Sequence, residues 1–588
     1  LVFWPERRTP ARGHRMRGSP RASGTGGAGR VNRAAAPSDA GAENARRRRA
    51  RPVIRVRARA PAIARARLTT IAPQRHPATH PIAELPACER AQGSLVLGPA
   101  EALSCEDVER VALRRGGQAV FSPEALQAMD RSVTALRAAH ARGEAIYGLT
   151  TGFGPHVVSP ASDDALEQGD GLIAHLGAGC GPLAGDAPAR AAMTVRAATI
   201  AQGRSAIDPR AAQALLSLLS AGVTPAIPEV GSVGASGDLI PLAHVARVIA
   251  GKGRVLCPAS PAGTRPAIDA LRDAGLAPVA LSGRDALAIV NGTAFMTAYA
   301  ALAVARAQRL LLACERLTGW AYRLLGCRAQ ALDPRLHAAR NHPNQEVSAA
   351  NILAEASRHG AWEDTTRPLQ EVYSLRCAPQ ILGACRDNAE YARVLIEREL
   401  GGVNDNPLVC DAGPGGVLHG GNFQGQQVAF ACDALNAALV QSAVLAERQL
   451  DVLCNPEFTG ATLLLAWRPG ATSGVAGAQI TATALVAEMR AHGLPAATAS
   501  IPTNGRNQDI VSMGTLAARQ AYGQTERLAR VLAILTIGVR QLAHLRDSGR
   551  CAGRTTPAPA WAPTYEPFTQ DRALHEDIER LAVAYLEA

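Results

Sequence analysis

From about residue 95 onwards, apolar residues recur with the helical period of 3.6, a pattern that predicts a mainly α-helical protein. The first two helices are expected to begin after Ser104 and Ser122, because acidic residues follow each serine in the first turn. The second helix is expected to run toward Ala141 and to bury a face of Leu126, Met129, Val133 and Leu136. Largely helical patterning continues over about 163–222.

Longer helical patterns follow a less regular stretch at 252–285, where short strands are expected near Val255 and Val279. The long patterns cover about 295–325, 424–453, 473–491 and 508–545, and loops rich in Pro, Gly and Asn are expected at 365–380, 401–423 and 492–507. Helices of this length with small residues on their faces indicate a close-packed bundle. We therefore expect a mixed, loop-rich N-terminal domain (91–290), a central helical bundle (291–550) and a C-terminal segment (551–588).

The first part of the chain differs in composition from the rest. The 588 residues carry a formal net charge of +12, but residues 1–80 hold 19 Arg and 3 acidic residues, which leaves 43 basic and 47 acidic residues elsewhere. Because it lacks a sustained helical period, the segment 1–90 is expected to be a disordered, solvated tail. Its arginine run at 46–49 leaves nucleic-acid binding as an alternative that we do not favour, and its composition loosely resembles an organellar transit peptide.

Cysteine spacing and apolar runs bear on compartment and membrane. The 12 cysteines form no Cys-x-x-Cys pair and show no metal-ligand spacing to the 14 histidines. We expect reduced core cysteines, no metal site and a cytoplasmic protein. The run from Ala286 to Ala305 has no charged residue, but Asn291, Gly292 and Thr293 interrupt it. A buried core helix is therefore favoured over a membrane span.

The triplet Ala235-Ser236-Gly237 holds the most unusual candidate chemistry. The Gly237 amide nitrogen can attack the Ala235 carbonyl, because glycine tolerates tight backbone conformations. Loss of water closes a five-membered ring, and loss of the Ser236 hydroxyl leaves an exocyclic methylidene. The product, 4-methylidene-imidazol-5-one (MIO), is an electrophile that no ordinary side chain offers. Taken alone, a Gly/Ser-rich stretch is far more often an ordinary turn.

The position of the triplet relative to the next helix strengthens this interpretation. A helix is expected over Leu239–Ala250, capped by Asp238 and ended at Gly251. The triplet would then lie at a helix N-terminus, where partial positive charge makes an electrophile more electron-poor.

Polar motifs recur in the loops and at predicted helix starts, where each one alone is typical of a cap or turn. Tyr373 and Arg376 are three residues apart, so both can point the same way, and Arg376 suits a bidentate contact with a carboxylate. His419–Gly425 and Asn507–Asp509 are each expected to open a long helix.

Together, these motifs resemble the aromatic amino acid lyase family, which comprises histidine, phenylalanine and tyrosine ammonia-lyases and related aminomutases. Six motifs stand in family order over residues 95 to 550: Tyr147–Gly154, Gly234–Asp238, Asn291–Thr293, Tyr373–Cys377, Asn404–Pro407 and Asn507–Asp509. The resemblance implies the long-helix, L-aspartase-like fold and a homotetramer with shared active sites. It also implies that MIO forms from the triplet and that no metal or dissociable cofactor is needed.

The resemblance further implies roles for individual side chains. Tyr147 is expected to be the base that removes a β-proton, with its pKa lowered by nearby positive helix ends. Asn291 and Tyr373 would help form and hold the electrophile and its amine adduct. Arg376 would bind the substrate carboxylate, helped by Asn406. One departure stands before the tyrosine, where the family commonly has Gln-Asp and this chain has Gln370-Glu371.

The pair His175-Leu176 bears on the substrate. By resemblance, tyrosine lyases carry His-Leu here, phenylalanine lyases Phe-Leu and histidine lyases Ser-His. A histidine can hydrogen-bond a phenol, and Gln508 stands where histidine lyases carry Glu. We therefore expect deamination of L-tyrosine to p-coumarate. Phenylalanine and histidine ammonia-lyases, an aminomutase, and a nucleic-acid-binding protein with an inactive lyase domain remain alternatives.

Overall fold

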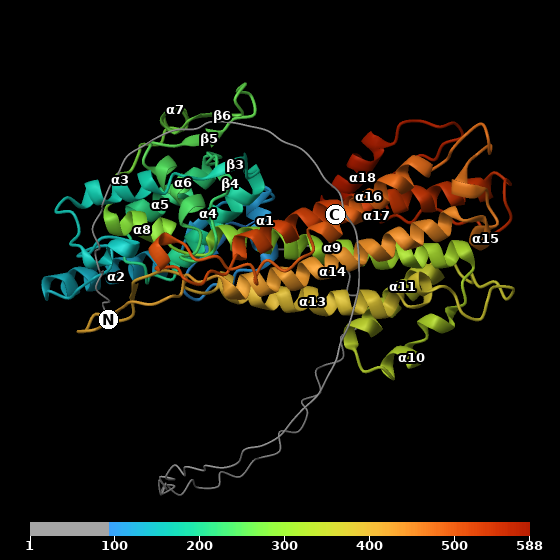
Figure 1. Ribbon diagram of the computed structural model, residues 1–588, viewed down its shortest axis with the longest axis horizontal. Helices are drawn as coiled ribbons and strands as arrows, with labels where there is room; N and C mark the ends of the chain where they lie inside the picture. The colour runs from blue at the N-terminus through green and yellow to red at the C-terminus, as the bar shows by residue number, and fades with distance from the viewer. Residues whose placement is uncertain (1–92, 588) are drawn as a thin grey trace, which may run out of the picture. The chain divides into compact units, whose positions relative to one another are not determined.

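The computed structural model describes residues 93–587, so the expectation of a disordered tail over residues 1–90 lies outside the described residues. This described part contains eighteen α-helices and eight short strands, which confirms the mainly α-helical fold. The long helices α9 (Ala294–Leu325), α13 (Ala378–Leu400), α14 (Gln426–Cys454) and α17 (Gly514–Asp547) run side by side through most of its length (Figure 1).

Shorter helices and strands gather at one end of this bundle (Figure 1). The helices of this end are α1 (Cys105–Ala112), α2 (Pro123–Ala141), α3 (Ala165–His175), α4 (Asp186–Ala201), α5 (Pro209–Ser220), α6 (Leu239–Ile249), α7 (Ala267–Asp273) and α8 (Gly283–Val290). The remaining helices are α10 (Pro334–Ala338), α11 (Pro343–Ser357), α12 (Tyr373–Arg376), α15 (Pro456–Thr459), α16 (Ala476–Ala491) and α18 (His575–Glu587).

The strands form four separate two-stranded sheets. The pair β1 (Leu95–Leu97) and β2 (Ala119–Phe121) is parallel. The antiparallel pairs are β3 (Cys180–Leu183) with β4 (Pro228–Val230), β5 (Arg254–Leu256) with β6 (Thr264–Pro266), and β7 (Leu408–Val409) with β8 (Val417–Leu418). Val255 lies in β5 as expected, whereas the strand expected near Val279 is wrong, because that residue lies in an irregular segment.

The two serine-started helices are confirmed. Ser104 Oγ accepts a hydrogen bond from Asp107 N at 3.1 Å, and the Asp107 side chain bonds back to the cap. Ser122 Oγ accepts one from Ala125 N at 3.1 Å, and the helix that follows ends at Ala141. Each side chain therefore satisfies an N–H group that has no partner within its helix.

Among the long helices, α9 and α14 begin and end within two residues of expectation, but α17 begins at Gly514 rather than near 508. The chain before α17 passes through left-handed backbone at Asn504, Arg506 and Met513, with φ of 51°, 65° and 56°. Because non-glycine residues seldom adopt this conformation inside a helix, Met513 prevents the helix from extending back to residue 508.

The uncharged run from Ala286 to Ala305 is buried, but it is not one helix. It breaks at Asn291–Thr293 into α8 and α9, so the polar residues mark a turn rather than an interruption. The helices α14 and α17 are long and apolar enough to cross a membrane, yet most of their apolar residues are buried against other helices. They are core helices of the bundle.

The expectation that the cysteines are core residues holds only in part. Six of the eleven described cysteines are buried, whereas Cys180 and Cys410 are exposed. Cys180 lies in the short strand β3, all four residues of which are exposed.

Candidate active site

The triplet Ala235-Ser236-Gly237 lies where several helices begin. α6 starts two residues after it. Gly425, just before α14, donates its N–H to Gly234 O at 3.4 Å, and Met513, just before α17, donates its N–H to Val233 O at 2.9 Å. Because each helix N-terminus carries partial positive charge, the turn lies in a positive field.

Close backbone contact fixes the conformation of Gly237. Its φ is +64°, and a Cβ added there would lie 2.1 Å from Gly292 O, so only glycine fits. The same Gly292 oxygen accepts a hydrogen bond from Asp238 N at 2.7 Å. The turn at Asn291–Thr293 therefore packs directly against the triplet.

Polar side chains approach the triplet from two sides. Asn291 Nδ2 donates to Ser236 O at 3.0 Å, and Gln508 Nε2 donates to Ser236 Oγ at 2.9 Å. Gly237 has no space for a side chain, the Ser236 hydroxyl is held by the Gln508 amide, and the Ser236 carbonyl is held by the Asn291 amide. The residues present therefore fit this prosthetic group.

Asp238 stands at the N-cap position of α6 as expected, but its side chain makes no capping hydrogen bond. Its buried carboxylate instead accepts hydrogen bonds from Met296 N at 2.8 Å, Ser232 Oγ at 2.7 Å and Thr515 Oγ1 at 2.6 Å. Burial raises the pKa of this carboxyl to about 6, although these hydrogen bonds oppose the shift. Asp238 therefore ties the triplet to the starts of α9 and α17.

A cavity of about 910 Å³ opens onto the triplet. It brings together nine of the residues singled out in the sequence: Tyr147, His175, Leu176, Ala235, Ser236, Gly237, Asn291, Asn406 and Gln508. Lining residues outside every motif named from the sequence include Gln168, Leu172 and Asn504. Nothing in their local patterns distinguishes them from ordinary core or loop positions.

Tyr147 is held at both its backbone and its phenol. Its N–H donates to His419 Nε2 at 3.1 Å, and its Oη accepts from Gly154 N at 2.7 Å. Burial raises the pKa of the phenol above its usual value, while the Gly154 N–H and the charge of Arg284 act in the opposite direction. The expectation of a lowered pKa is therefore wrong for this chain, because burial has the larger effect.

Tyr373 and Arg376 point the same way, as expected, but they do not line this cavity. The Arg376 guanidinium carbon lies 4.5 Å from the Tyr373 ring centroid. Ser374, which lies between them in sequence, accepts a hydrogen bond at its backbone oxygen from Gln449 Nε2 at 2.9 Å. Gln449 lies near the C-terminal end of α14. Gln449 follows Gly425 by 24 residues, or about 36 Å of helix at 1.5 Å per residue. Within one chain, the pair lies far from the triplet.

The departure at Glu371 is accommodated by an ion pair. The buried Glu371 carboxylate accepts two hydrogen bonds from Arg367, at 2.9 Å from Nε and 2.6 Å from Nη2. Its backbone oxygen accepts from Arg376 Nε at 2.8 Å. Although Glu371 is longer than aspartate, its backbone still holds the Arg376 side chain in place.

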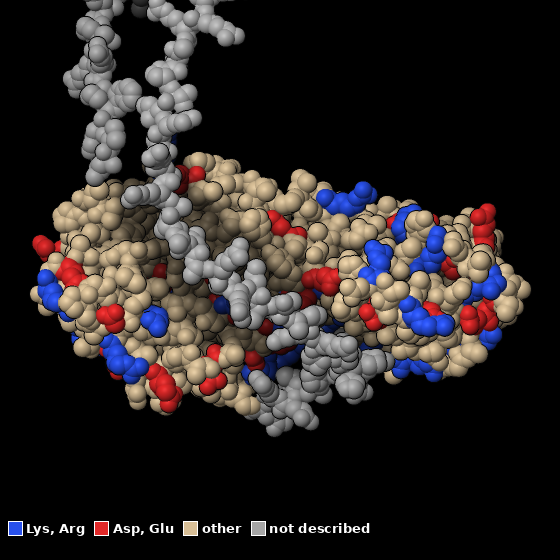
Figure 2. Space-filling model, turned by 90° about the horizontal axis from the view of Figure 1, so that it is seen from below, with Lys and Arg blue, Asp and Glu red and all other residues tan. Residues whose placement is uncertain are grey.

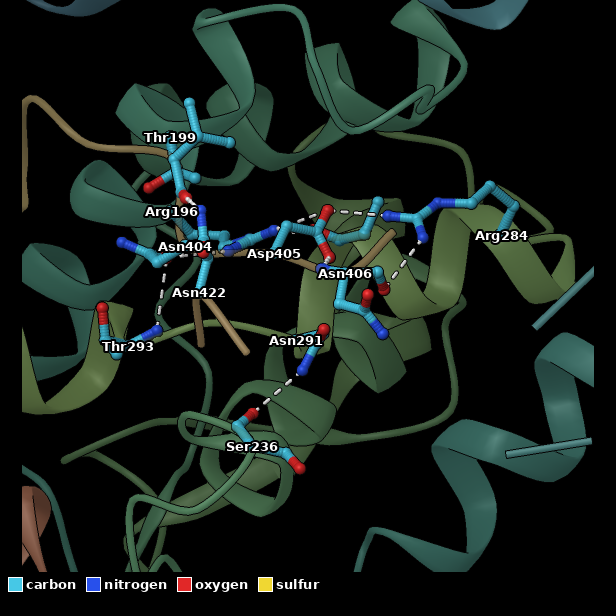
Figure 3. A network of polar contacts seen from close by, with 12 residues as sticks. Arg196, Thr199, Ser236, Arg284, Asn291, Thr293, Asn404, Asp405, Asn406 and Asn422 are labelled. Carbon is cyan, nitrogen blue, oxygen red and sulfur yellow. Dashed lines mark hydrogen bonds and ion pairs between the residues drawn. The ribbon is translucent and has the colours of Figure 1, made fainter. Parts of the chain in front are cut away.

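A buried ionic network that sequence reasoning missed lies behind the cavity (Figure 3). Asp405 Oδ2 lies 2.7 Å from Arg284 Nη2 and 3.5 Å from Arg196 Nη2, and both arginines are almost fully buried. The sequence does carry one sign of this network, because Arg196 stands inside the Ala-rich apolar run of α4.

A bundle of long helices whose N-termini meet at an Ala-Ser-Gly turn beside a cavity is the arrangement expected of the aromatic amino acid lyases. The profile of the family described as "Aromatic amino acid lyase" matches residues 103–562, and the chain belongs to this family. It is an enzyme of the aromatic amino acid ammonia-lyase class, and the family uses the MIO group.

Three relatives show how far the comparison reaches. The chain is similar to a tyrosine ammonia-lyase of Cupriavidus metallidurans, with 39% identity over 80% of this chain and 92% of that protein. It is similar to a histidine ammonia-lyase of an Anaeromyxobacter species, with 38% identity over 82% of this chain and 96% of that protein. The crystal structure of a tyrosine aminomutase from Streptomyces globisporus superposes with a TM-score of 0.76 and 34% identity, covering 84% of this chain and 97% of that one. These relatives are named for different substrates and for two reactions. They therefore establish the class of enzyme, and the substrate is a separate question.

Proposed function

We propose that this enzyme deaminates L-tyrosine to p-coumarate and ammonia. The observation that carries the proposal is His175 at the cavity that holds the triplet. His175 Nδ1 lies 3.0 Å from Gly171 O. Because a carbonyl only accepts, Nδ1 carries the proton, which leaves Nε2 of the neutral ring as an acceptor for a phenol O–H.

The chain's own residues account for the rest of the reaction. MIO formed from the triplet would supply an electrophile for the substrate amine, which would make nitrogen a better leaving group. Tyr147, as phenolate, removes the β-proton, and Asn406 helps to hold the substrate carboxylate. Asn291 and Gln508 hold Ser236 from two sides. The helix N-termini around the turn favour negative charge that develops there.

The identity of the base predicts the pH dependence. Because burial raises the pKa of Tyr147, the phenolate is scarce at neutral pH and increases about tenfold per pH unit below that pKa. We expect kcat/KM to rise with pH through the alkaline range. The substrate ammonium group also titrates there, so Tyr147→Phe is the comparison: its residual activity should rise less steeply with pH. Equal slopes for both proteins would argue against Tyr147 as the base.

His175 predicts the choice between tyrosine and phenylalanine. His175→Phe should lower the ratio of kcat/KM for L-tyrosine over L-phenylalanine by about 10- to 100-fold, or about 1.4–2.8 kcal/mol, because the phenol O–H loses its acceptor. The measurement is initial rates with each substrate, and His140→Phe, on exposed α2 surface, is the control. An unchanged ratio would remove His175 from substrate selection.

Product analysis separates the remaining functions. Purified enzyme is offered Tyr, Phe and His separately, and p-coumarate, cinnamate and urocanate are followed by absorbance. Dominant urocanate or cinnamate would make the chain a histidine or phenylalanine lyase. Formation of β-tyrosine would make it an aminomutase, which returns the ammonia to the β-carbon.

We also propose a cytoplasmic enzyme that does not depend on its arginine-rich segment. On the face seen in Figure 2, basic and acidic side chains of the described part are interspersed. Deleting residues 1–90 should therefore change kcat and KM for L-tyrosine by less than about twofold, which is below 0.5 kcal/mol. The nucleic-acid-binding alternative would be favoured by a different result. In that case the intact chain would show no detectable turnover, and truncation would abolish nucleic-acid binding.

A further inference from the structure

We propose that Arg196 and Asp405 are positioning residues that hold the Asn291–Thr293 turn against the triplet so that its ring can close. This inference rests on the proposed function, because it concerns formation of the same prosthetic group. Neither side chain is among the described residues that line the cavity. Their effect would pass through the turn that they support.

Arg196 is the direct support of this turn. Its side chain is fully buried, and a Cβ added at Gly292 would lie 2.1 Å from Arg196 Nη1. Arg196 Nε donates to Ala288 O at 2.8 Å, in the last turn of α8, and Nη1 donates to Asn404 Oδ1 at 3.3 Å. The guanidinium therefore binds the segment that leads into Gly292 and also packs beneath it.

The other end of the turn is held by the same network (Figure 3). Thr293 N donates to Asn404 Oδ1 at 3.3 Å, and Thr293 Oγ1 donates to Glu399 Oε1. Between these anchors, Gly292 O accepts from Asp238 N and Asn291 Nδ2 donates to Ser236 O, so the turn contacts the triplet on both sides. A shift of the turn would therefore displace the triplet.

Asp405 links this support to the substrate side of the cavity. Its carboxylate lies between Arg196 and Arg284, and Arg284 Nη1 donates to Asn406 O at 3.3 Å. Burying three charges costs free energy, and such networks are often replaceable by apolar residues without loss of stability. If the network of Arg196, Asp405 and Arg284 fixes one backbone conformation of the turn, that role is a physical reason to keep three buried charges here.

The step that depends on this geometry releases two water molecules. The Gly237 nitrogen joins the Ala235 carbonyl carbon, and the Ala235 oxygen leaves as water with the amide protons of Ser236 and Gly237. Ser236 then loses its hydroxyl and its α-proton as a second water. Ring closure needs close approach of two backbone atoms, and a misplacement of about 1 Å costs on the order of 10²-fold in rate.

The test is the intact mass of denatured protein, which reports ring formation without any activity assay. We expect the unaltered chain to be two waters lighter than its sequence mass. Arg196→Met and Asp405→Asn should be folded by circular dichroism but mature about 10²-fold more slowly, so that most molecules retain water. Arg196→Lys, which keeps the charge but not the forked contact, should be intermediate.

Arg190→Met is the matched control. Arg190 lies six residues earlier on α4, is also buried, and donates to Val111 O, Ala112 O and Leu219 O, away from the turn. This variant should lose stability yet mature at the normal rate. Normal maturation of Arg196→Met and Asp405→Asn overturns the inference. So does insolubility of all three network variants, which would assign the network to stability. An unprocessed parent chain would instead overturn the proposed function.

Discussion

Replacing Ser236 by alanine is expected to lower kcat for L-tyrosine by at least about 10³-fold, or roughly 4 kcal/mol of transition-state stabilisation. Alanine has no hydroxyl to lose, so the methylidene cannot form. Ala235 and Gly237 remain, and the small side chain fits the same space. The loss should therefore arise from the missing chemistry and not from unfolding.

Two measurements on Ser236→Ala support each other. The release of p-coumarate is followed by absorbance, and the intact mass shows whether the second water has been lost. Ser217→Ala on α5 is the control, because its hydroxyl bonds only to Gln213 O at 2.9 Å within the same helix. A Ser236→Ala enzyme with normal turnover would falsify the role of the triplet.

Local patterns predicted much of the fold, because helix signals act over a few residues. Serine caps placed the starts of α1 and α2. The apolar stripe of α13 at Leu382, Cys385, Ala389, Ala392 and Ile396 was a usable signal that the sequence analysis passed over. The start of α17 was not predictable in this way, because Met513, the left-handed residue directly before Gly514, is neither glycine nor proline.

Electrostatic surroundings were harder to predict than element positions. An aspartate before a helix favours a cap, yet Asp238 turns toward Met296 N and Thr515, which lie far away in sequence. The pKa of Tyr147 depends on how deeply the folded chain buries the phenol. Both outcomes depend on long-range packing, about which a local motif carries no information.

The family resemblance implies active sites shared between chains, but the local motifs do not show which site residues lie apart within one chain. Nine of them line one cavity, whereas Tyr373 and Arg376 lie near the other end of α14, about 36 Å away along the helix. Tyr373 is 67% exposed although it is a large aromatic residue. We propose that this pair completes the cavity of another copy of the chain in a homotetramer.

Mixing two inactive variants tests this proposal. Arg376→Met should lower kcat/KM by a factor equivalent to about 2–5 kcal/mol of lost transition-state stabilisation, because the substrate carboxylate loses its charged partner. If each site takes the triplet from one chain and Arg376 from another, an equimolar mixed assembly of Ser236→Ala and Arg376→Met chains has about a quarter of its sites intact. Co-expression with two different affinity tags allows the mixed assembly to be purified and its p-coumarate release to be measured.

The matched control pairs Ser236→Ala with Tyr147→Phe. Both residues line the cavity of one chain, so their mixture should contain no site in which one chain supplies both groups, and activity should stay at the level of the single variants. Recovery in the first mixture alone therefore requires the triplet and Arg376 to come from different chains. Absence of recovery there, with a homotetramer present by light scattering, would return Arg376 to a structural role on α12.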